Sequence, residues 1–137
     1  MKDLDQTIGI LDFLGSWKVK RRIDDAKTGW VTRFEGLAVI TQDLFHEDGF
    51  IRLQRQTLPS QRSYRLDWGN ASVDVRRPSG APFITLQTAG VQKVQHLCGD
   101  DLYRGLFLFS DKNRWAEAWV VEGPRKKYRS FSHYWRA

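Results

Sequence analysis

Hydrophobic and polar residues alternate in short runs along most of this chain, and glycine, asparagine, aspartate or proline separates the runs. A period of two places alternate side chains on opposite faces of a β-strand. In residues 16–23, for example, Trp17, Val19, Arg21 and Ile23 share one face. Runs of this kind predict strands over residues 16–23, 30–42, 50–58, 82–88, 93–98, 102–110, 114–122 and 127–136, and a hairpin over 62–77 about the turn DWGN.

The N-terminal residues depart from this pattern. Their apolar residues are spaced by three, which is typical of an amphipathic helix. They include Ile8, Leu11 and Leu14. We therefore predict a short helix over residues 5–15, with Asp5 or Thr7 as its N-cap and Gly15 at its C-terminal end.

About nine or ten strands and one short helix predict an all-β protein. A long antiparallel sheet in a small chain tends to curl on itself, because curling removes exposed strand edges. We expect an antiparallel up-and-down barrel, with a two-sheet sandwich as the alternative. Gly36 lies within a predicted strand and indicates a bend or bulge of the kind that closed barrels need. The length suits one domain, residues 1–137.

Charge and composition narrow the possible environment and partners. Lysine and arginine total 22 against 16 acidic residues, a net charge of +6 that attracts anions. Basic residues are dense only in 18–22 and 125–129, which favours an anionic small molecule over a dedicated nucleic-acid module. The chain has no run of about 20 apolar residues, no basic signal-peptide region, and in Cys98 a single cysteine. We expect a cytoplasmic protein without a membrane partner.

Two sets of motifs resemble known families. GSW at 15–17 follows the predicted helix and Arg136 ends the last predicted strand. This pairing resembles the lipocalin and calycin pattern, in which tryptophan packs under arginine at the closed end of a barrel. The series FLGSW, RFEGLA, HLCGDDLYR, RWAEAW and GPRKKYRSFSHY resembles, in order and spacing, the bacterial domain of unknown function 6314 family, whose members are predicted calycin-like barrels. The resemblance implies a lipocalin- or calycin-like barrel closed by Trp17 and Arg136, and no particular activity.

The motif residues that this family resemblance carries over come mainly from two hairpins. They are His96, Cys98, Asp101, Tyr103, Arg125, Lys126 and Tyr128. Two stretches differ from the family pattern. Residues 79–86 lack the acidic and histidine residues expected between strands, and the strand predicted over 50–58 lacks an expected glutamate.

Strand parity predicts polar side chains among aromatic ones inside the barrel. Glu117 lies between Trp115 and Trp119 on one face, and it is a natural partner for Arg21 or Arg104. A buried arginine needs such a partner, because an unpaired buried charge is strongly destabilising. The expected interior cluster is drawn from Arg21, His96, Arg104, Glu117 and Tyr128. It is either a structural ion-pair plug or part of a small-molecule pocket.

Three functional hypotheses follow. The first is a barrel that binds a small amphipathic, anionic molecule in its interior, where His96 and Arg104 anchor the acidic group. The second is a lipocalin-like acid–base enzyme of decarboxylase, cyclase or isomerase type on a small carboxylate, with His96, Tyr128 and Glu117 as catalytic candidates. The third is a basic barrel that binds nucleic acid, which needs exposed aromatic side chains between basic ones. The expected ligand-binding residues are Arg21, His96, Cys98, Tyr103, Arg104, Phe107, Trp115, Glu117, Trp119 and Tyr128, with Phe109 in the same wall.

His96 and Cys98 are residue types that can act in nucleophilic catalysis or bind a metal ion. They lie two residues apart on one strand, so their side chains are roughly 6–7 Å apart, longer than a nucleophile–base hydrogen bond. Together with His133 they lack the spacing of a zinc motif. We therefore expect no metal and no cofactor, and His96 and Cys98 are either pocket residues or ordinary residues of the barrel wall.

Overall fold

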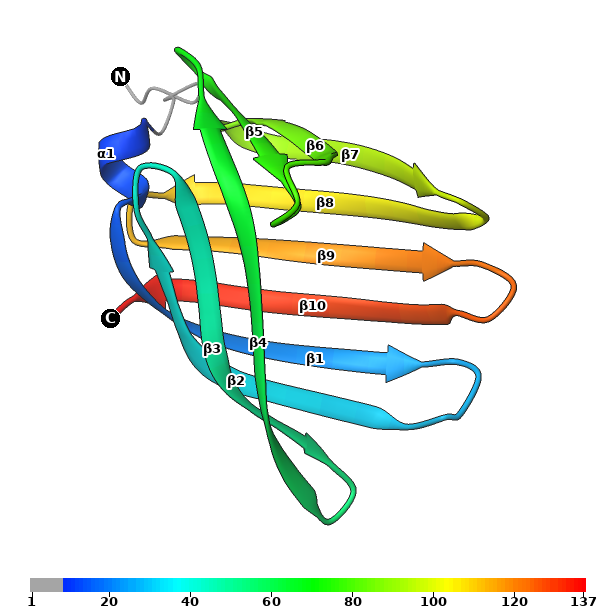
Figure 1. Ribbon diagram of the computed structural model, residues 1–137. Helices are drawn as coiled ribbons and strands as arrows, with labels where there is room; N and C mark the ends of the chain where they lie inside the picture. The colour runs from blue at the N-terminus through cyan, green and yellow to red at the C-terminus, as the bar shows by residue number, and fades with distance from the viewer. Residues whose placement is uncertain (1–8) are drawn as a thin grey trace.

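Ten antiparallel strands form one sheet that curls into a nearly closed barrel in the computed structural model, which describes residues 9–137 (Figure 1). The order across the sheet is β6-β5-β4-β3-β2-β1-β10-β9-β8-β7. The strands are β1 (Gly15–Asp25), β2 (Val31–Ile40), β3 (Leu44–Leu53), β4 (Gln56–Trp68), β5 (Ser72–Arg76), β6 (Pro82–Gln87), β7 (Gly90–Cys98), β8 (Asp101–Asp111), β9 (Arg114–Glu122) and β10 (Lys127–Arg136). The predicted up-and-down barrel of about nine or ten strands is confirmed, and the sandwich alternative is wrong.

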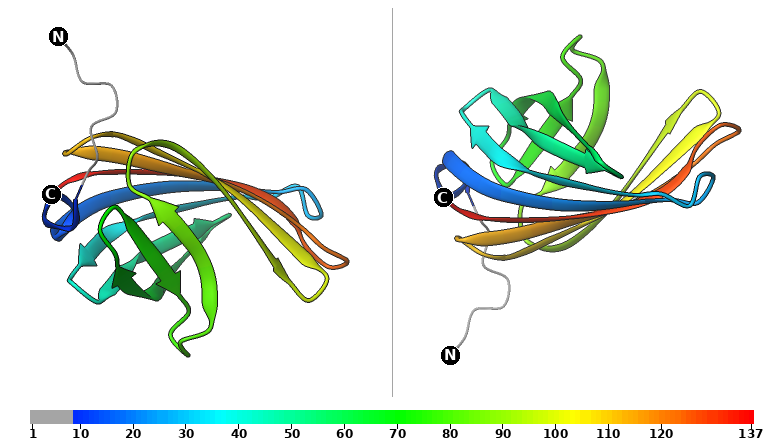
Figure 2. Two further views of the ribbon diagram at one scale, coloured as in Figure 1. Left: turned by 90° about the horizontal axis from the view of Figure 1, so that it is seen from above. Right: turned by 90° about the horizontal axis from the view of Figure 1, so that it is seen from below.

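The barrel is open along one seam. β6 and β7 follow one another in sequence, but they lie at the two ends of the sheet order and no ladder joins them. β1 and β10 pair along their length, from Trp17 opposite Arg136 to Asp25 opposite Tyr128. Figure 2 shows β3–β6 folded across one face of the remaining strands, near the end that carries α1. The interior is therefore enclosed at that end, and the hairpins β7–β8 and β9–β10 project away from it.

Alternating burial along the strands builds one aromatic and aliphatic core inside the barrel. Phe107, Phe109, Trp115 and Trp119 all lie inward on β8 and β9, as strand parity predicts, and all four are buried. Their sheet neighbours on the opposite face, such as Leu106 and Leu108, are only partly buried. The core is a dense aromatic packing in which Trp115 stacks on another ring, that of Tyr134, at 3.7 Å between centroids.

The third and fourth strands differ from the prediction. Residues 50–58 do not form one strand, because the chain turns at Gln54, whose φ is 56°. β3 instead begins at Leu44 and continues through Gly49. The sequence offers glycine at 49, inside the strand, and no glycine at the real turn, so the turn signals were misplaced. As a result the strand that was expected to lack a glutamate carries Glu47.

Gly36 does not form the predicted bend or bulge. It lies opposite Gly49 in the regular β2–β3 ladder, without a register shift. A Cβ atom on Gly36 would collide with the backbone of Asp48, and one on Gly49 with the backbone of Glu35. The two glycines therefore allow two strands to approach closely, which is the other common reason for glycine within a strand.

The N-terminal helix is shorter than predicted. Among residues 9–137 the only helix is α1 (Ile10–Phe13), whose first turn is closed by a hydrogen bond from the Gly9 N–H to the Asp12 carboxylate. The predicted N-caps Asp5 and Thr7 lie outside the described residues. Of the predicted apolar face, Leu14 packs against the core, Leu11 is 80 % exposed, and Ile8 lies outside the described residues. The buried residue of the helix is Phe13. Gly15 follows the helix with a positive φ of 114°, which suits glycine at a helix end.

Candidate functional site

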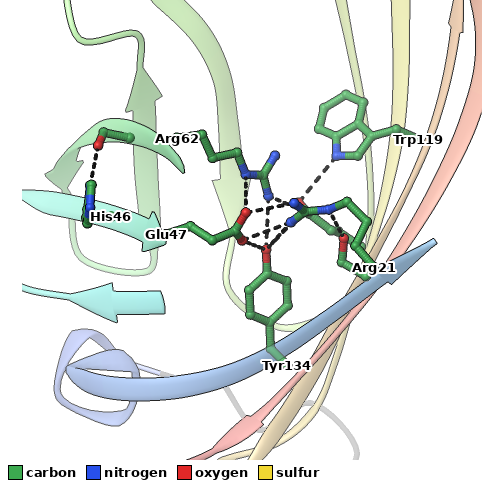
Figure 3. A network of polar contacts seen from close by, with 9 residues as sticks. Arg21, His46, Glu47, Arg62, Trp119 and Tyr134 are labelled. Atoms are coloured by element: carbon green, nitrogen blue, oxygen red, sulfur yellow. Dashed lines mark hydrogen bonds and ion pairs between the residues drawn. The ribbon is translucent and has the colours of Figure 1, made fainter. Parts of the chain in front are cut away.

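Two arginines and two glutamates meet inside the barrel around a tyrosine hydroxyl (Figure 3). Five strands each supply one member of this group. Its members are Arg21 on β1, Glu47 on β3, Arg62 on β4, Glu117 on β9 and Tyr134 on β10. We call these five residues the ion-pair cluster. The sequence predicted Arg21 or Arg104 as the partner of Glu117, and in the structure the charged atoms of Arg21 and Glu117 are 3.5 Å apart.

Glu47 is the most heavily bonded member of the ion-pair cluster. Arg21 donates to both of its carboxylate oxygens, at 2.7 and 2.8 Å. Arg62 Nε donates to Oε1 at 3.0 Å, and the Tyr134 hydroxyl donates to Oε2 at 2.6 Å. The Glu47 side chain is only 1 % exposed, so these bonds replace all of its hydration.

Glu117 forms the other negative pole of the cluster. Arg62 Nη2 donates to its Oε1 at 2.5 Å, and the indole N–H of Trp119 donates to its Oε2 at 3.3 Å. Arg62 thus bridges the two carboxylates through Nε and Nη2. In Figure 3 its remaining terminal nitrogen, Nη1, carries no dashed line, and no hydrogen bond joins it to any of residues 9–137.

The charges inside the cluster determine its protonation. Burial alone would raise the pKa of Glu47, but the Arg21 hydrogen bonds and the nearby Arg62 charge outweigh it and hold that pKa below its ordinary value. Burial likewise opposes the ionised form of Glu117, and the charges of Arg62 and Arg21 lower its pKa. Burial and the neighbouring carboxylates raise the pKa of Tyr134 well above its ordinary value. At neutral pH the cluster therefore holds two ion pairs and a protonated tyrosine.

This arrangement predicts loss of stability in acid. A carboxyl group stabilises the fold when its pKa is lower in the folded than in the unfolded chain. This contribution is complete above the unfolded pKa, about 4.3 for glutamate, and it is lost as the pH falls through the folded pKa. Urea unfolding of the wild type should show a free energy that falls steeply below about pH 4. The Glu47→Gln variant should show a shallower fall, and the control Glu35→Gln, at an exposed position, should retain the wild-type slope. Equal slopes for Glu47→Gln and wild type would contradict the cluster's role.

A cavity lies beside the ion-pair cluster. Its volume is about 80 Å³, which is room for several waters. Most of its wall is aromatic or aliphatic, and Arg62 and Glu117 supply its charged part. Phe107, Phe109, Trp115 and Trp119, predicted as pocket walls, all line it. The cavity therefore combines an apolar body with one polar side.

The two ends of the cavity are built differently. At the closed end Phe13 of α1 lines it, and Trp17 donates its indole N–H to the Phe13 carbonyl at 2.9 Å. The Arg136 guanidinium lies 4.0 Å from the Trp17 ring centroid and donates to the carbonyls of Leu14 and Asp12. The structure thus brings together the two residues that the lipocalin-like pattern pairs, and they hold the helix over this end of the barrel.

At the other end an aromatic group surrounds Phe83, near the β6–β7 seam. Phe83 stacks between Tyr64 and Trp119, with ring centroids 5.6 and 5.5 Å away. His96 and Tyr103 pack edge-on against it at 5.1 and 6.1 Å. Phe83, Tyr64 and Trp119 also line the cavity, so this aromatic group forms part of its wall.

Six residues predicted for the pocket do not line the cavity: Arg21, His96, Cys98, Tyr103, Arg104 and Tyr128. Two of these, Arg104 and Cys98, do not lie in the barrel interior. Arg104 lies on the outer face, where its side chain is 52 % exposed and pairs with Glu122 at 2.8 Å. It shares the strand face of Leu102 and Leu106, opposite Phe107, so strand parity already excluded it. Cys98 is exposed at the end of β7. The prediction of these two side chains in the barrel interior is wrong.

The remaining predicted residues lie toward the hairpin end. His96 contacts the Phe83 ring and is not part of the ion-pair cluster, contrary to the expected cluster of five. Tyr128 is half-buried against the core, and burial raises the pKa of its hydroxyl. Lys126 donates to the Tyr103 hydroxyl at 3.1 Å and pairs with Asp101 at 3.4 Å. Lys126 therefore contacts two other motif residues that the family resemblance carries over, Tyr103 and Asp101.

The prediction did not include Glu47, Arg62 or Tyr134. Arg62 begins an alternating series with Tyr64, Leu66 and Trp68, whose period of two would have placed it inward. Glu47 follows Phe45 by two, but both residues lie between the strands predicted over 30–42 and 50–58, and the structure places them in β3. Among residues 9–137 no group of three or more histidine, cysteine or acidic residues is placed to hold a metal ion. Within the same residues no helix has the length and apolar character needed to cross a membrane.

The fold and its interior define a small calycin-like barrel with a charged cluster beside an aromatic cavity. The chain belongs to the family of unknown function DUF6314, whose model matches residues 13–136. The fold is similar to that of the S-type phycobiliprotein lyase from Guillardia theta, with a TM-score of 0.63 and 10% identity over 93% of this chain and 90% of that chain. It is also similar to a protein of unknown function of the DUF3598 family from Nostoc punctiforme, with a TM-score of 0.59 and 9% identity over 98% of this chain and 51% of that chain. No curated protein matches the chain in sequence.

Proposed function

We propose that this protein binds a small amphipathic molecule with an anionic group in the interior of its barrel. The cavity supports this proposal, because an apolar aromatic wall with a few convergent polar groups is the usual composition of a small-molecule site. The similar barrel from Guillardia theta is a phycobiliprotein lyase, but at 10% identity that likeness concerns the fold. The proposal therefore depends on the cavity of this chain.

Arg62 carries the proposal, in place of the predicted anchor Arg104. Its side chain lines the cavity and is 30 % exposed, and its Nη1 has no partner among the described residues. A guanidinium nitrogen with two free N–H groups is a strong donor to a carboxylate. Because Glu47 and Glu117 already offset both arginine charges, we infer that the anionic group approaches Arg62 only from the Nη1 side. Water still reaches the side chain there and screens the repulsion.

The geometry favours binding over acid–base catalysis. A general acid or base works best with a pKa near the working pH. Glu117 has a lowered pKa and is fixed by Arg62 and Arg21, so it stays ionised at neutral pH. The pKa of Tyr128 is shifted in the opposite direction, because burial raises it further above neutrality. These catalytic candidates are therefore poorly suited to proton transfer, whereas Arg62 is well placed to hold an acceptor.

The nucleic-acid hypothesis also has little support from the outer surface. Among residues 9–137 the exposed aromatic side chains are Trp30, Phe50 and Phe131. They lie on the β1–β2 turn, β3 and β10, and two strands separate β3 from β10 in the sheet. A stacking platform for single-stranded nucleic acid needs aromatic side chains in succession along a basic groove. Three scattered rings do not form such a platform.

The test uses para-isopropylbenzoate as the probe and isothermal titration calorimetry as the measurement. Arg62→Lys keeps the positive charge but removes Nη1, and we expect it to weaken binding about tenfold, the loss of one charge-assisted hydrogen bond. The control Arg104→Ala removes an exposed arginine from the outer face and should leave the affinity within twofold. Wild-type affinity in Arg62→Lys, or a comparable loss in Arg104→Ala, would contradict the assignment.

A change in the probe tests the same contact without changing the protein. The neutral amide para-isopropylbenzamide has the same shape as the acid, and its weaker binding to the wild type would support an anionic ligand. Equal binding of acid and amide would contradict the anionic character of the ligand even if Arg62→Lys fails to fold. Circular dichroism of each variant identifies that case.

A further inference from the structure

The inward-facing tryptophans fall into two groups by their hydrogen bonds. Trp17 donates its indole N–H to the Phe13 carbonyl at 2.9 Å, and Trp119 donates to Glu117 at 3.3 Å. The indole N–H groups of Trp68 and Trp115 are buried and have no partner among residues 9–137. Buried donors in native proteins nearly always have a partner, so two unpaired ones in one small barrel require an explanation.

Both unpaired donors belong to residues that line the same cavity. Trp68 is on β4 and Trp115 on β9, and both rings pack against Phe13, with centroids 5.8 and 6.5 Å away. They therefore flank the closed end of the cavity, beneath α1. Nη1 of Arg62, a further donor of the cavity wall without a partner among the described residues, belongs to the same strand as Trp68.

Trp68 and Trp115 lie at different distances from the ion-pair cluster along their strands. Trp68 follows Arg62 by six residues along β4, a separation of about 20 Å at the usual strand rise. On β9, Trp115 is two residues from Glu117, so the shorter step from the ion-pair cluster to Trp115 is about 7 Å. A compact aromatic molecule spans the shorter distance. Trp115, which is 7 % exposed, is therefore the first donor that a bound molecule would meet.

We propose that the ligand carries a second polar group, a neutral hydrogen-bond acceptor at its apolar end, which accepts from the indole N–H of Trp115, with Trp68 as a further donor. This inference rests on the proposed function and specifies the class of ligand. The ligand is a carboxylate whose far end bears a carbonyl or ether oxygen or a ring nitrogen, such as an acyl-substituted aromatic acid. A purely hydrocarbon tail leaves the Trp115 donor unpaired, so the site discriminates against it.

The first test compares two probes of the same shape, para-acetylbenzoate and para-isopropylbenzoate. The ketone oxygen of the first replaces a methyl group of the second, so the difference between their affinities isolates the acceptor. We expect the wild type to bind the ketone about five- to tenfold more tightly, in line with one buried hydrogen bond. In Trp115→Phe, which keeps an aromatic ring but no N–H, the ratio of the two affinities should fall to about one, whatever the change in the wall does to both probes alike.

The second test observes the donors directly. The chain has six tryptophans, so a nitrogen–proton correlation spectrum of the wild type contains six indole signals. Trp115→Phe and Trp68→Phe assign the two of interest by their disappearance. We expect para-acetylbenzoate to move the Trp115 signal downfield, the usual direction for a new hydrogen bond, and para-isopropylbenzoate to leave it nearly in place. This measurement needs only the wild type once the signals are assigned.

The outcomes separate this inference from the proposed function. If neither probe binds the wild type, the proposed function itself fails. If both bind with equal affinity and the Trp115 signal responds equally to both, binding stands and the acceptor inference is wrong. If Trp115→Phe retains the ketone preference, the acceptor contacts some other donor, and the assignment to Trp115 is overturned.

Discussion

Replacement of Glu47 by alanine is expected to lower the free energy of unfolding by about 3–5 kcal/mol, a large fraction of the stability of an ordinary domain. The carboxylate is almost completely buried, and it accepts hydrogen bonds from Arg21, Arg62 and Tyr134. Alanine would leave two guanidinium groups inside the barrel with only Glu117 to offset them. An uncompensated buried charge is far more destabilising than the loss of an average contact.

The matched control for this prediction is Glu35→Ala on the neighbouring strand β2. Glu35 is exposed and lies 3.9 Å from Lys20, so its removal should change the unfolding free energy by less than about 1 kcal/mol. Urea denaturation at pH 7, followed by tryptophan fluorescence and circular dichroism, measures both variants. Similar losses for the two glutamates would mean that the ion-pair cluster is not coupled to the fold.

The cluster is not explained by stability alone. Burying two ion pairs costs desolvation free energy, and well-packed hydrophobic side chains of similar volume often give an equal or more stable core. This cluster, however, adjoins a cavity and leaves one arginine nitrogen without a partner among residues 9–137. A charged group fixed by several hydrogen bonds is well oriented for binding, because little rearrangement is needed when a ligand arrives. This combination is the reason for placing the candidate site here.

The sequence predicted best those features that follow from local alternation. β8 and β9 keep a period of two over their whole length, so the inward positions of Phe107, Phe109, Trp115 and Trp119 were predictable without knowledge of the sheet. The same parity predicts Arg104 on the outer face. The prediction of Arg104 in the pocket contradicted this parity, and the structure shows it exposed and paired with Glu122.

The features that the sequence did not predict depend on pairings between distant strands. Glu47 and Arg62 meet Glu117 and Tyr134 across the barrel, and no local pattern specifies which inward residues will meet. The position of the β3–β4 turn was also predicted wrongly, which hid Glu47. Gly49 lies inside β3, and the positive φ of the turn is at Gln54. Non-glycine residues rarely adopt that conformation, so a glutamine gave no turn signal.

Replacement of Trp17 by alanine is the second change expected to have a large effect, a loss of about 3–5 kcal/mol in unfolding free energy. The indole is buried at the closed end, where it donates to the Phe13 carbonyl and lies under the Arg136 guanidinium. Alanine would leave a void there, remove the cation–π contact and release one of the bonds that hold α1. Since Phe13 lines the cavity, we also expect weaker binding of para-isopropylbenzoate.

Trp30→Ala provides the control, because it makes the same change in side chain at an exposed position on the β1–β2 turn. It should cost less than about 1 kcal/mol and leave the probe affinity unchanged, since surface substitutions away from such contacts have small effects. Trp17→Phe separates the two roles of the indole: it keeps an aromatic ring beneath Arg136 but loses the hydrogen bond to Phe13. A stability close to wild type in Trp17→Ala would show that neither the ring nor its contact with Arg136 closes the barrel. An unfolding free energy of Trp17→Phe between those of wild type and Trp17→Ala would show how much of the loss comes from packing and how much from the hydrogen bond.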